Sequence, residues 1–74
     1  MWYSVSLKPG NKEKHPALYA RKSSEPGYVL FSNGGHVNFA TTVEDAQTRY
    51  IVGSKLSDDR SEQIEQRYQW ELHR

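Results

Sequence analysis

Apolar and polar residues alternate along the first segment of the chain, residues 2–7, and this period predicts a β-strand. Tyr3, Val5 and Leu7 fall on one side of the segment, while Trp2 falls on the other side with two serines. Alternation of this kind is typical of a strand that packs one face against a core. The chain therefore begins with a predicted strand.

Two further strands are predicted between turn signals. Residues 8–16 are a polar, lysine-rich connection punctuated by Pro and Gly, and residues 17–23 are a short strand whose basic end is typical of a sheet edge. Pro26 and Gly27 predict a turn, because Pro presets φ and Gly accepts the positive φ of a type II turn. Residues 28–32 follow as a third strand.

Asn33 and Gly34 predict a tight hairpin from the third strand into a fourth strand at residues 36–40, because both central residues of a type I′ turn need positive φ. If Gly34 and Gly35 form the turn instead, the register changes but the same four side chains are expected on one face of the sheet. These four are Tyr28, Leu30, Val37 and Phe39.

The next segment carries the signals of the main helix, predicted at about 42–52. Thr41 and Glu44 match a capping box, in which each side chain accepts from a free backbone N–H at the helix start. The apolar residues at helical spacing are Val43, Ala46 and Tyr50. Gly53 stands where a left-handed C-terminal cap is expected. We expect this helix to pack on the face formed by the four hairpin residues.

The last third of the chain fits two patterns. A single helix from about residue 58 aligns Ile64, Tyr68 and Leu72 on one stripe but leaves Trp70 off it. Alternatively, a short helix at about 58–66 precedes a C-terminal strand at about 67–73. The second pattern is favoured because it buries the tryptophan, and such a strand would pair with the first one.

These elements predict an α+β fold, with an antiparallel sheet of four to five strands and one main helix on one face. The 74 residues are expected to form a single small domain, 1–74. The chain has no cysteine, which excludes disulfides and thiolate chemistry and favours a reducing, cytoplasmic setting. Neither a membrane-spanning run nor a signal-peptide pattern is expected.

The sequence lacks the residue patterns of catalysis, cofactor binding and metal binding. It contains no Gly-x-Ser-x-Gly elbow and no phosphate-binding Gly-Lys-Ser/Thr motif. His15, His36 and His73 are far apart, and none belongs to a His-Glu-x-x-His pattern. We therefore expect a protein that is not an enzyme and needs no cofactor, no metal and no small-molecule substrate.

Nucleic-acid binding is one of two functional hypotheses. The net charge is only +1, but the first 37 residues hold five Lys or Arg and two Glu, whereas the second half is acidic. A basic first hairpin beside an aromatic sheet face would bind phosphates and stack bases. The candidate contacts are Lys8, Lys12, Lys14, Arg21 and Lys22.

A module that binds another protein or itself, in the second case as a homodimer, is the favoured hypothesis. Nine of the 74 residues are aromatic, which is more than one small sheet and one helix are expected to hide. An uncovered aromatic patch is typical of a partner surface, and Trp2 and Trp70 are the expected anchors. The full candidate surface is Trp2, Phe31, His36, Asn38 and Trp70.

The order of parts also carries a resemblance. An opening Trp-Tyr-x-Val strand and a Gly-punctuated hairpin lead into a helix through Phe39, Thr41, Val43, Glu44, Asp45 and Ala46, and a closing aromatic strand follows. This layout resembles small phage or prophage-encoded α+β proteins. The resemblance implies an accessory factor. Some proteins of this class act by binding host proteins, and the resemblance implies no site residues.

Overall fold

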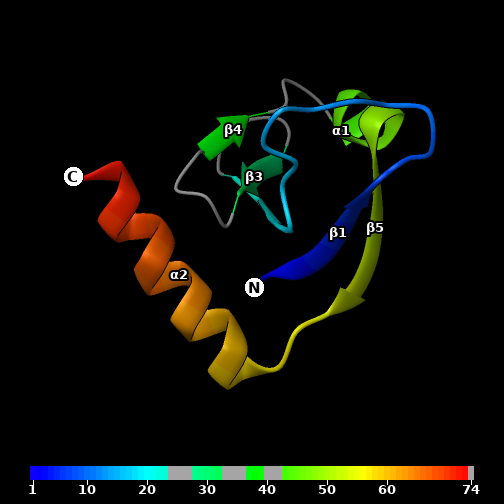
Figure 1. Cartoon of the computed structure of the whole chain (residues 1–74). Coiled ribbons are helices and arrows are strands. Elements are labelled where there is room, and N and C mark those ends of the chain that lie inside the picture. The colour runs from blue at the N-terminus through cyan, green and yellow to red at the C-terminus, as the bar shows by residue number, and fades with distance from the viewer. Residues whose placement is uncertain (24–27, 33–36, 40–42, 74) are drawn as a thin grey trace.

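The computed structural model describes residues 1–23, 28–32, 37–39 and 43–73, which contain five strands and two helices. The strands are β1 (Tyr3–Leu7), β2 (Tyr19–Lys22), β3 (Tyr28–Phe31), β4 (Val37–Phe39) and β5 (Tyr50–Lys55). The helices are α1 (Val43–Arg49) and α2 (Asp58–Leu72). Figure 1 shows their arrangement, with α2 alongside the sheet and α1 at the far end of β5.

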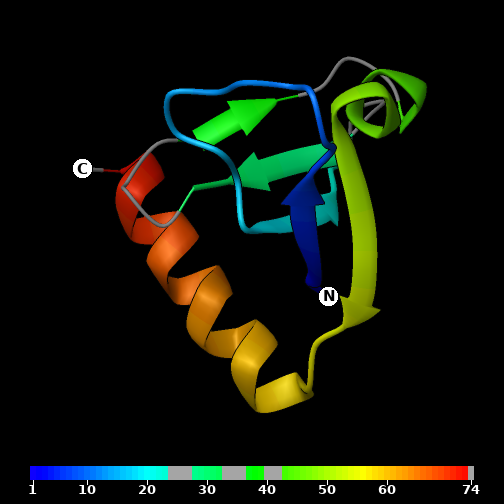
Figure 2. The same ribbon diagram turned by 45° about the vertical axis from the view of Figure 1, so that its right-hand side comes forward.

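The α+β class and the antiparallel sheet are confirmed. The described strands form one sheet in the order β4-β3-β2-β1-β5, and every adjacent pair is antiparallel. The turned view in Figure 2 shows α2 crossing beside β2, β3 and β4 while β5 stands at the opposite end of the sheet. The prediction that residues 17–23 form an edge strand is wrong, because β2 lies between β1 and β3. The basic residue Arg21 on β2 is paired with Glu65 of α2.

The predicted main helix at 42–52 is wrong in its last three residues, 50–52. α1 ends at Arg49, and Tyr50 starts a strand that pairs with β1 in the place predicted for a C-terminal strand. Aromatic and β-branched residues favour an extended backbone, Tyr50, Ile51 and Val52 form such a run, and pairing with β1 stabilises it as a strand. They also alternate, since Tyr50 is buried and Ile51 is exposed. The predicted capping residue Thr41 lies outside the described residues.

The hairpin of β3 and β4 has a register that neither predicted turn produces. Leu30 pairs with Asn38, and Phe31 and Val29 pair with Val37 and Phe39. The register is thus displaced by one residue from both predictions. The inference that Tyr28, Leu30, Val37 and Phe39 share one face is therefore wrong, because a one-residue slip moves every side chain of a strand to the other face.

The C-terminal segment is one helix, so the strand predicted at 67–73 is wrong. Ser57 caps α2, with its Oγ accepting from the backbone N–H of Arg60 at 3.2 Å, and two acidic residues occupy the first turn. Ile64 and Tyr68 are the buried residues of the helix, whereas Trp70 is 59% exposed. Helix capping and the Ile64–Tyr68 stripe outweigh the burial of this tryptophan. Among the described residues, no helix is long and apolar enough to cross a membrane.

Trp2 joins α2 to the sheet through its aromatic ring. Its exposed fraction is 1%, and it packs edge-on against Tyr68 and Phe31 at centroid distances of 5.5 and 6.2 Å. Arg21 places its guanidinium over the Trp2 ring at 5.6 Å and over the Tyr68 ring at 5.2 Å. Edge-to-face rings and stacked guanidinium groups add to the burial of apolar area. This cluster also contains Val29 and Ile64.

The polar atoms of Trp2 also form hydrogen bonds with α2 and with the segment before it. These bonds and the ring contacts around Trp2 together are called the Trp2 joint. The indole N–H donates to Glu65 Oε1 at 2.9 Å, the backbone N–H donates to Ser61 Oγ at 3.2 Å, and the backbone carbonyl accepts from Leu56 N–H at 2.9 Å. Arg21 Nε lies 3.0 Å from the same Glu65 oxygen, as a charge pair without the alignment of a hydrogen bond. Trp2, the residue before β1, is therefore bonded to three positions in and before α2.

A second apolar cluster occupies the opposite face of the sheet. It contains Val5, Ala17, Ala20, Leu30 and Tyr50. The segment between β1 and β2 closes one end of this face, because Ala17 N–H donates to the Tyr50 hydroxyl at 3.1 Å and Glu13 pairs with Arg49 at 3.0 Å. The two clusters lie on either side of one sheet, so the domain has a core on each face.

The Trp2 joint generates a stability test. We expect Trp2→Phe to lower the free energy of unfolding by about 1–3 kcal/mol, because it removes the indole donor and leaves the Glu65 carboxylate with one partner fewer. Trp2→Ala should cost about 3–5 kcal/mol, which is comparable with the whole stability of a domain of this size. Trp70→Phe is the matched control and should change the free energy by less than about 0.5 kcal/mol. Urea unfolding followed by circular dichroism measures the free energy of unfolding of all three variants. Equal losses for Trp2→Phe and Trp70→Phe would contradict a stabilising role of the Trp2 contacts.

The hydroxyl of Tyr68 generates a pH test. Burial raises the pKa of Tyr68 above its ordinary value of 10.0, Glu65 acts in the same direction, and Arg21 opposes it. A raised pKa in the folded state means that the unfolded chain releases this proton first, so stability is kept below pH 10 and falls as the pH rises toward the folded-state pKa. The difference in unfolding free energy between the unmodified protein and Tyr68→Phe should therefore shrink between pH 8 and pH 11. A constant difference over that range would be the contrary result.

Candidate functional site

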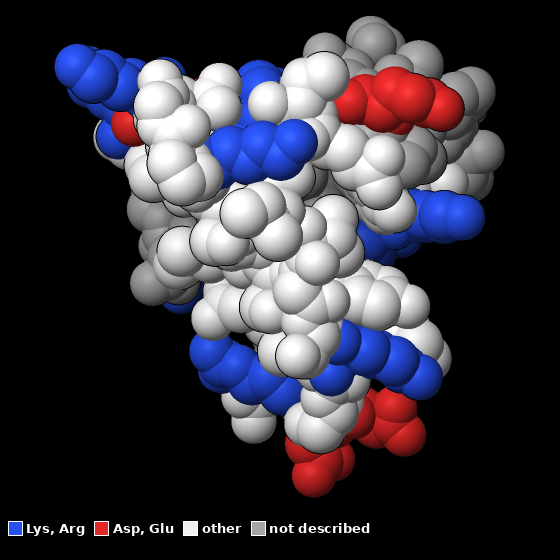
Figure 3. All heavy atoms as spheres, turned by 90° about the vertical axis from the view of Figure 1, so that its right-hand side faces the viewer, with Lys and Arg blue, Asp and Glu red and all other residues white. Residues whose placement is uncertain are grey.

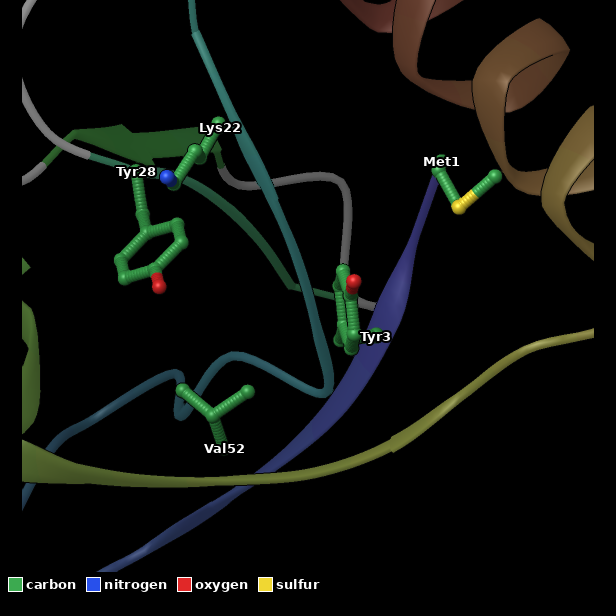
Figure 4. Close-up of a pocket in the computed structure, with 5 residues that line it drawn as sticks. All are labelled: Met1, Tyr3, Lys22, Tyr28 and Val52. Carbon is green, nitrogen blue, oxygen red and sulfur yellow. The ribbon is translucent and has the colours of Figure 1, made fainter.

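An open pocket lies on the sheet face opposite α2, at the end that the β1–β2 segment does not close. Its volume is about 510 Å³, and its described lining residues are Met1, Tyr3, Lys22, Tyr28 and Val52. Figure 4 shows Lys22 beside Tyr28, with Tyr3 and Val52 approaching the same space from other strands. The pocket is therefore built by β1, β2, β3 and β5 together with the N-terminal residue.

Strand alternation places these side chains together. Tyr3 pairs with Ala20, and Lys22 pairs with Tyr28, so the lining positions fall on the same face of adjacent strands. Val52 joins them through its pairing with Val5. The buried side chains of Val5, Ala20 and Leu30 lie on the same face of the sheet. Tyr28 and Val52, which line the pocket, pack against them. The pocket thus stands on a buried apolar base.

The chemistry of the pocket combines apolar walls with a few polar groups. Tyr3 and Tyr28 are half-buried and supply ring faces and hydroxyls, and Lys22 is exposed and supplies a positive charge. None of the described lining residues is acidic. Tyr and Lys side chains donate hydrogen bonds, so the arrangement suits an apolar group that carries or adjoins an anion. The described lining residues include no paired acid and base.

The strand β5 forms one border of this site. Figure 3, which faces the β5 and α1 side of the molecule, shows mainly uncharged atoms along its middle, with Lys and Arg side chains on both sides of them.

A β-bulge interrupts the pairing of β1 with β5 between Tyr3 and Val5. A Cβ added to Gly53 would lie 2.8 Å from Ser4 Oγ and 3.3 Å from the Ser4 carbonyl oxygen. Gly53 therefore allows the two backbones to approach each other here.

The predicted interaction residues divide into three groups. Trp2 and Phe31 are 1% and 2% exposed, so the prediction that they form an accessible surface is wrong: both belong to the joint beneath α2. Trp70 is exposed on α2, with the Arg67 guanidinium 5.9 Å from its ring centroid. His36 lies outside the described residues, and of Asn38 only the backbone position in β4 is described.

The predicted nucleic-acid contacts do not form one patch. Lys8, Lys12 and Lys14 belong to the segment that follows β1, whereas Lys22 ends β2 beside the start of β1. These groups therefore lie at opposite ends of β1. Arg21 faces α2, where Glu65 and two aromatic rings engage it. Of the five basic residues, only Lys22 reaches the pocket.

Metal ligands are not grouped in the part of the chain that the structure describes. No cluster of three or more His, Cys, Asp or Glu side chains occurs there. His15 and His73 are exposed and belong to different ends of the chain, one before β2 and one at the end of α2.

Sequence reasoning missed four of the five lining residues. The sequence predicts Tyr28 on the face beneath the helix at 42–52, Val52 within that helix, and Tyr3 on the core-facing side of the first strand. The signal that would have revealed the site is the run Tyr50, Ile51 and Val52. A strand at this position shortens the helix that was expected to cover this face of the sheet. Met1 gave no signal.

Comparison of the chain with protein-family models, with curated proteins and with solved structures finds no match in any of the three.

Gly53 generates a test of the strand pairing at this border. We expect Gly53→Ala to lower the free energy of unfolding by about 1 kcal/mol or more, because the added methyl group meets Ser4. Combining it with Ser4→Ala removes the nearest atom and should recover part of the loss, so the double-mutant cycle should give a favourable coupling. Additive costs in urea unfolding would show that Ser4 and Gly53 do not approach each other in this way.

Proposed function

We propose that the chain is a non-catalytic, cytoplasmic module that binds another protein through the pocket of Tyr3, Lys22, Tyr28, Val52 and Met1. The observation that carries the proposal is the open pocket on the face of the sheet that α2 leaves uncovered. Its volume of about 510 Å³ falls within the range of sites that hold a small ligand or a few side chains of a partner.

The residue types support a binding role for this pocket. Tyrosine presents a large, rigid contact area and a hydroxyl at low cost in side-chain entropy, and Tyr3 and Tyr28 are each only half-buried. Met1 is 61% exposed and adds a flexible apolar side chain. Aromatic and methionine side chains around one positive charge are typical of a surface that recognises proteins.

Nucleic-acid binding is less well supported by the geometry. Phosphate binding needs several positive charges along one path, and the basic residues of the first hairpin are separated by the length of β1. Tyr3 and Tyr28 supply rings on which bases could stack, but Lys22 is the one basic group among the described lining residues. The nuclease arm of the experiment below separates the two hypotheses.

The test is affinity capture from a lysate of the source cells, with and without nuclease treatment. We expect the unmodified protein to retain at least one protein that resists nuclease treatment, and we expect the double variant Tyr28→Ala, Lys22→Glu to lose it. Lys12→Glu is the matched control, because it makes the same charge change in an exposed residue outside the pocket. Circular dichroism verifies that each variant is folded.

Two results would contradict the proposal. Capture that the pocket variant leaves unchanged places the binding surface elsewhere, and capture that nuclease abolishes indicates a nucleic-acid partner.

A further inference from the structure

We propose that the partner binds as an extended strand along the outer edge of β5, with an apolar side chain in the pocket and, two residues away on the same face, a carboxylate directed toward Lys22. This inference rests on the proposed function and names the partner's conformation and charge. In this mode of recognition, backbone hydrogen bonds supply affinity and pockets for alternate side chains supply specificity.

The first step is the position of β5 in the sheet. β5 ends the strand order and pairs on one side with β1, and in the described part of the chain no strand pairs with its other side. Ile51 is 49% exposed, and the residues from Gly53 to Lys55 are also exposed. The outer side of β5 is therefore an accessible edge.

The second step is the direction of the backbone groups. In an antiparallel ladder, residue pairs alternate between those that exchange hydrogen bonds and those whose N–H and C=O groups point away from each other. Lys8 N–H donates to the Arg49 carbonyl at 2.9 Å, which makes the pair two residues further on, Ser6 and Ile51, a bonded pair too. Val5 and Val52 then form a non-bonded pair.

An independent contact supports this alternation. Val5 N–H donates to the Leu18 carbonyl at 2.9 Å, so it points toward the β2 side and away from β5. Its partner Val52 must then direct its own N–H and C=O away from β1, to the outer edge. Val52 thus offers a donor and an acceptor to an added strand.

The third step links this edge to the pocket. Residues directly opposite each other on neighbouring strands share a face, with Cβ atoms about 4.5–5.5 Å apart. The residue of an added strand that pairs with Val52 therefore lies on the pocket face, next to a residue that lines the pocket. One strand can use the edge and the pocket at the same time.

The fourth step is the charge of the partner. Lys22 lines the pocket, and Lys55 of β5 pairs with Tyr3 on the same face. Both lysines are exposed, and none of the described lining residues is acidic. Residues two apart on a strand share a face, so a strand that carries an apolar residue and an acidic residue two positions apart complements this surface.

A second copy of the chain fits the edge less well. If two β5 strands paired in antiparallel fashion about Val52, Lys55 of one copy would lie opposite Arg49 of the other. Like charges directly opposite each other destabilise strand pairs. We therefore assign the edge to an acidic segment of a different protein.

The test starts from random 12-residue peptides displayed on phage and selected on the full chain. We expect the selected peptides to carry an apolar residue and an acidic residue two positions apart, so that both face the pocket side. A synthetic copy of the strongest one should bind the unmodified protein in fluorescence polarisation. Selection of no peptide, or of peptides without this spacing, would overturn the inference.

Matched variants then locate the bound peptide. Val52→Pro removes the outward N–H and should weaken binding about tenfold, whereas Val52→Ala keeps that N–H and should weaken it less. Lys22→Glu should weaken binding by a similar factor, and the control Lys12→Glu should leave it unchanged. Methylation of alternate backbone nitrogens of the peptide should abolish binding without altering the protein, which covers the case that Val52→Pro does not fold.

The remaining outcomes separate the two proposals. Sensitivity to Lys22→Glu and to Tyr28→Ala without sensitivity to backbone methylation would overturn strand addition and leave the proposed pocket function intact. Insensitivity to all pocket and edge variants would overturn both. A dimer in light scattering that Val52→Pro dissociates would assign the edge to a second copy and overturn the inference.

Discussion

The contact between the indole of Trp2 and the Glu65 carboxylate is the interaction on which the arrangement of this domain depends. Glu65 also accepts from the Gln69 side chain at 2.7 Å and lies beside Arg21, so one carboxylate connects β1, β2 and two turns of α2. The Glu65 side chain is 35% exposed, and the hydrogen bonds that it accepts involve a charged group, which makes them stronger than bonds between neutral groups. The joint therefore fixes which face of the sheet the long helix covers.

Covering one face has a consequence for the other. The chain has one long described helix, and the Trp2 joint commits it to the face that carries Val29 and Phe31. On the opposite face the β1–β2 segment covers the end near Tyr50 but leaves the end near Tyr3 and Tyr28 open. The proposed binding surface is the part of the sheet that remains.

Much of the sheet could be predicted from the sequence, because alternation and turn residues act over short distances. β1, β2, β3 and β4 fall within the predicted segments. The errors arose where tertiary contacts decide: the Tyr50–Val52 run became a strand once β1 was available to pair with it, and Trp70 remained exposed although burial of tryptophan is usually favourable. Trp2 was expected on an accessible surface but is buried. Its burial depends on Ile64 and Tyr68, which are distant in the sequence and are connected to Trp2 by no local pattern. The site was missed for the same reason.

Hydrogen exchange at the Trp2 indole and along α2 tests the role of the joint most directly. If Trp2 holds the helix on the sheet, its indole N–H and the amides of Ile64 and Tyr68 should exchange together with the central strands β1 and β2, at the rate of global unfolding. Rapid exchange of the Trp2 indole and of α2 while β1 and β2 stay protected would show that the helix detaches independently. That result would contradict the central role assigned to the bond between Trp2 and Glu65.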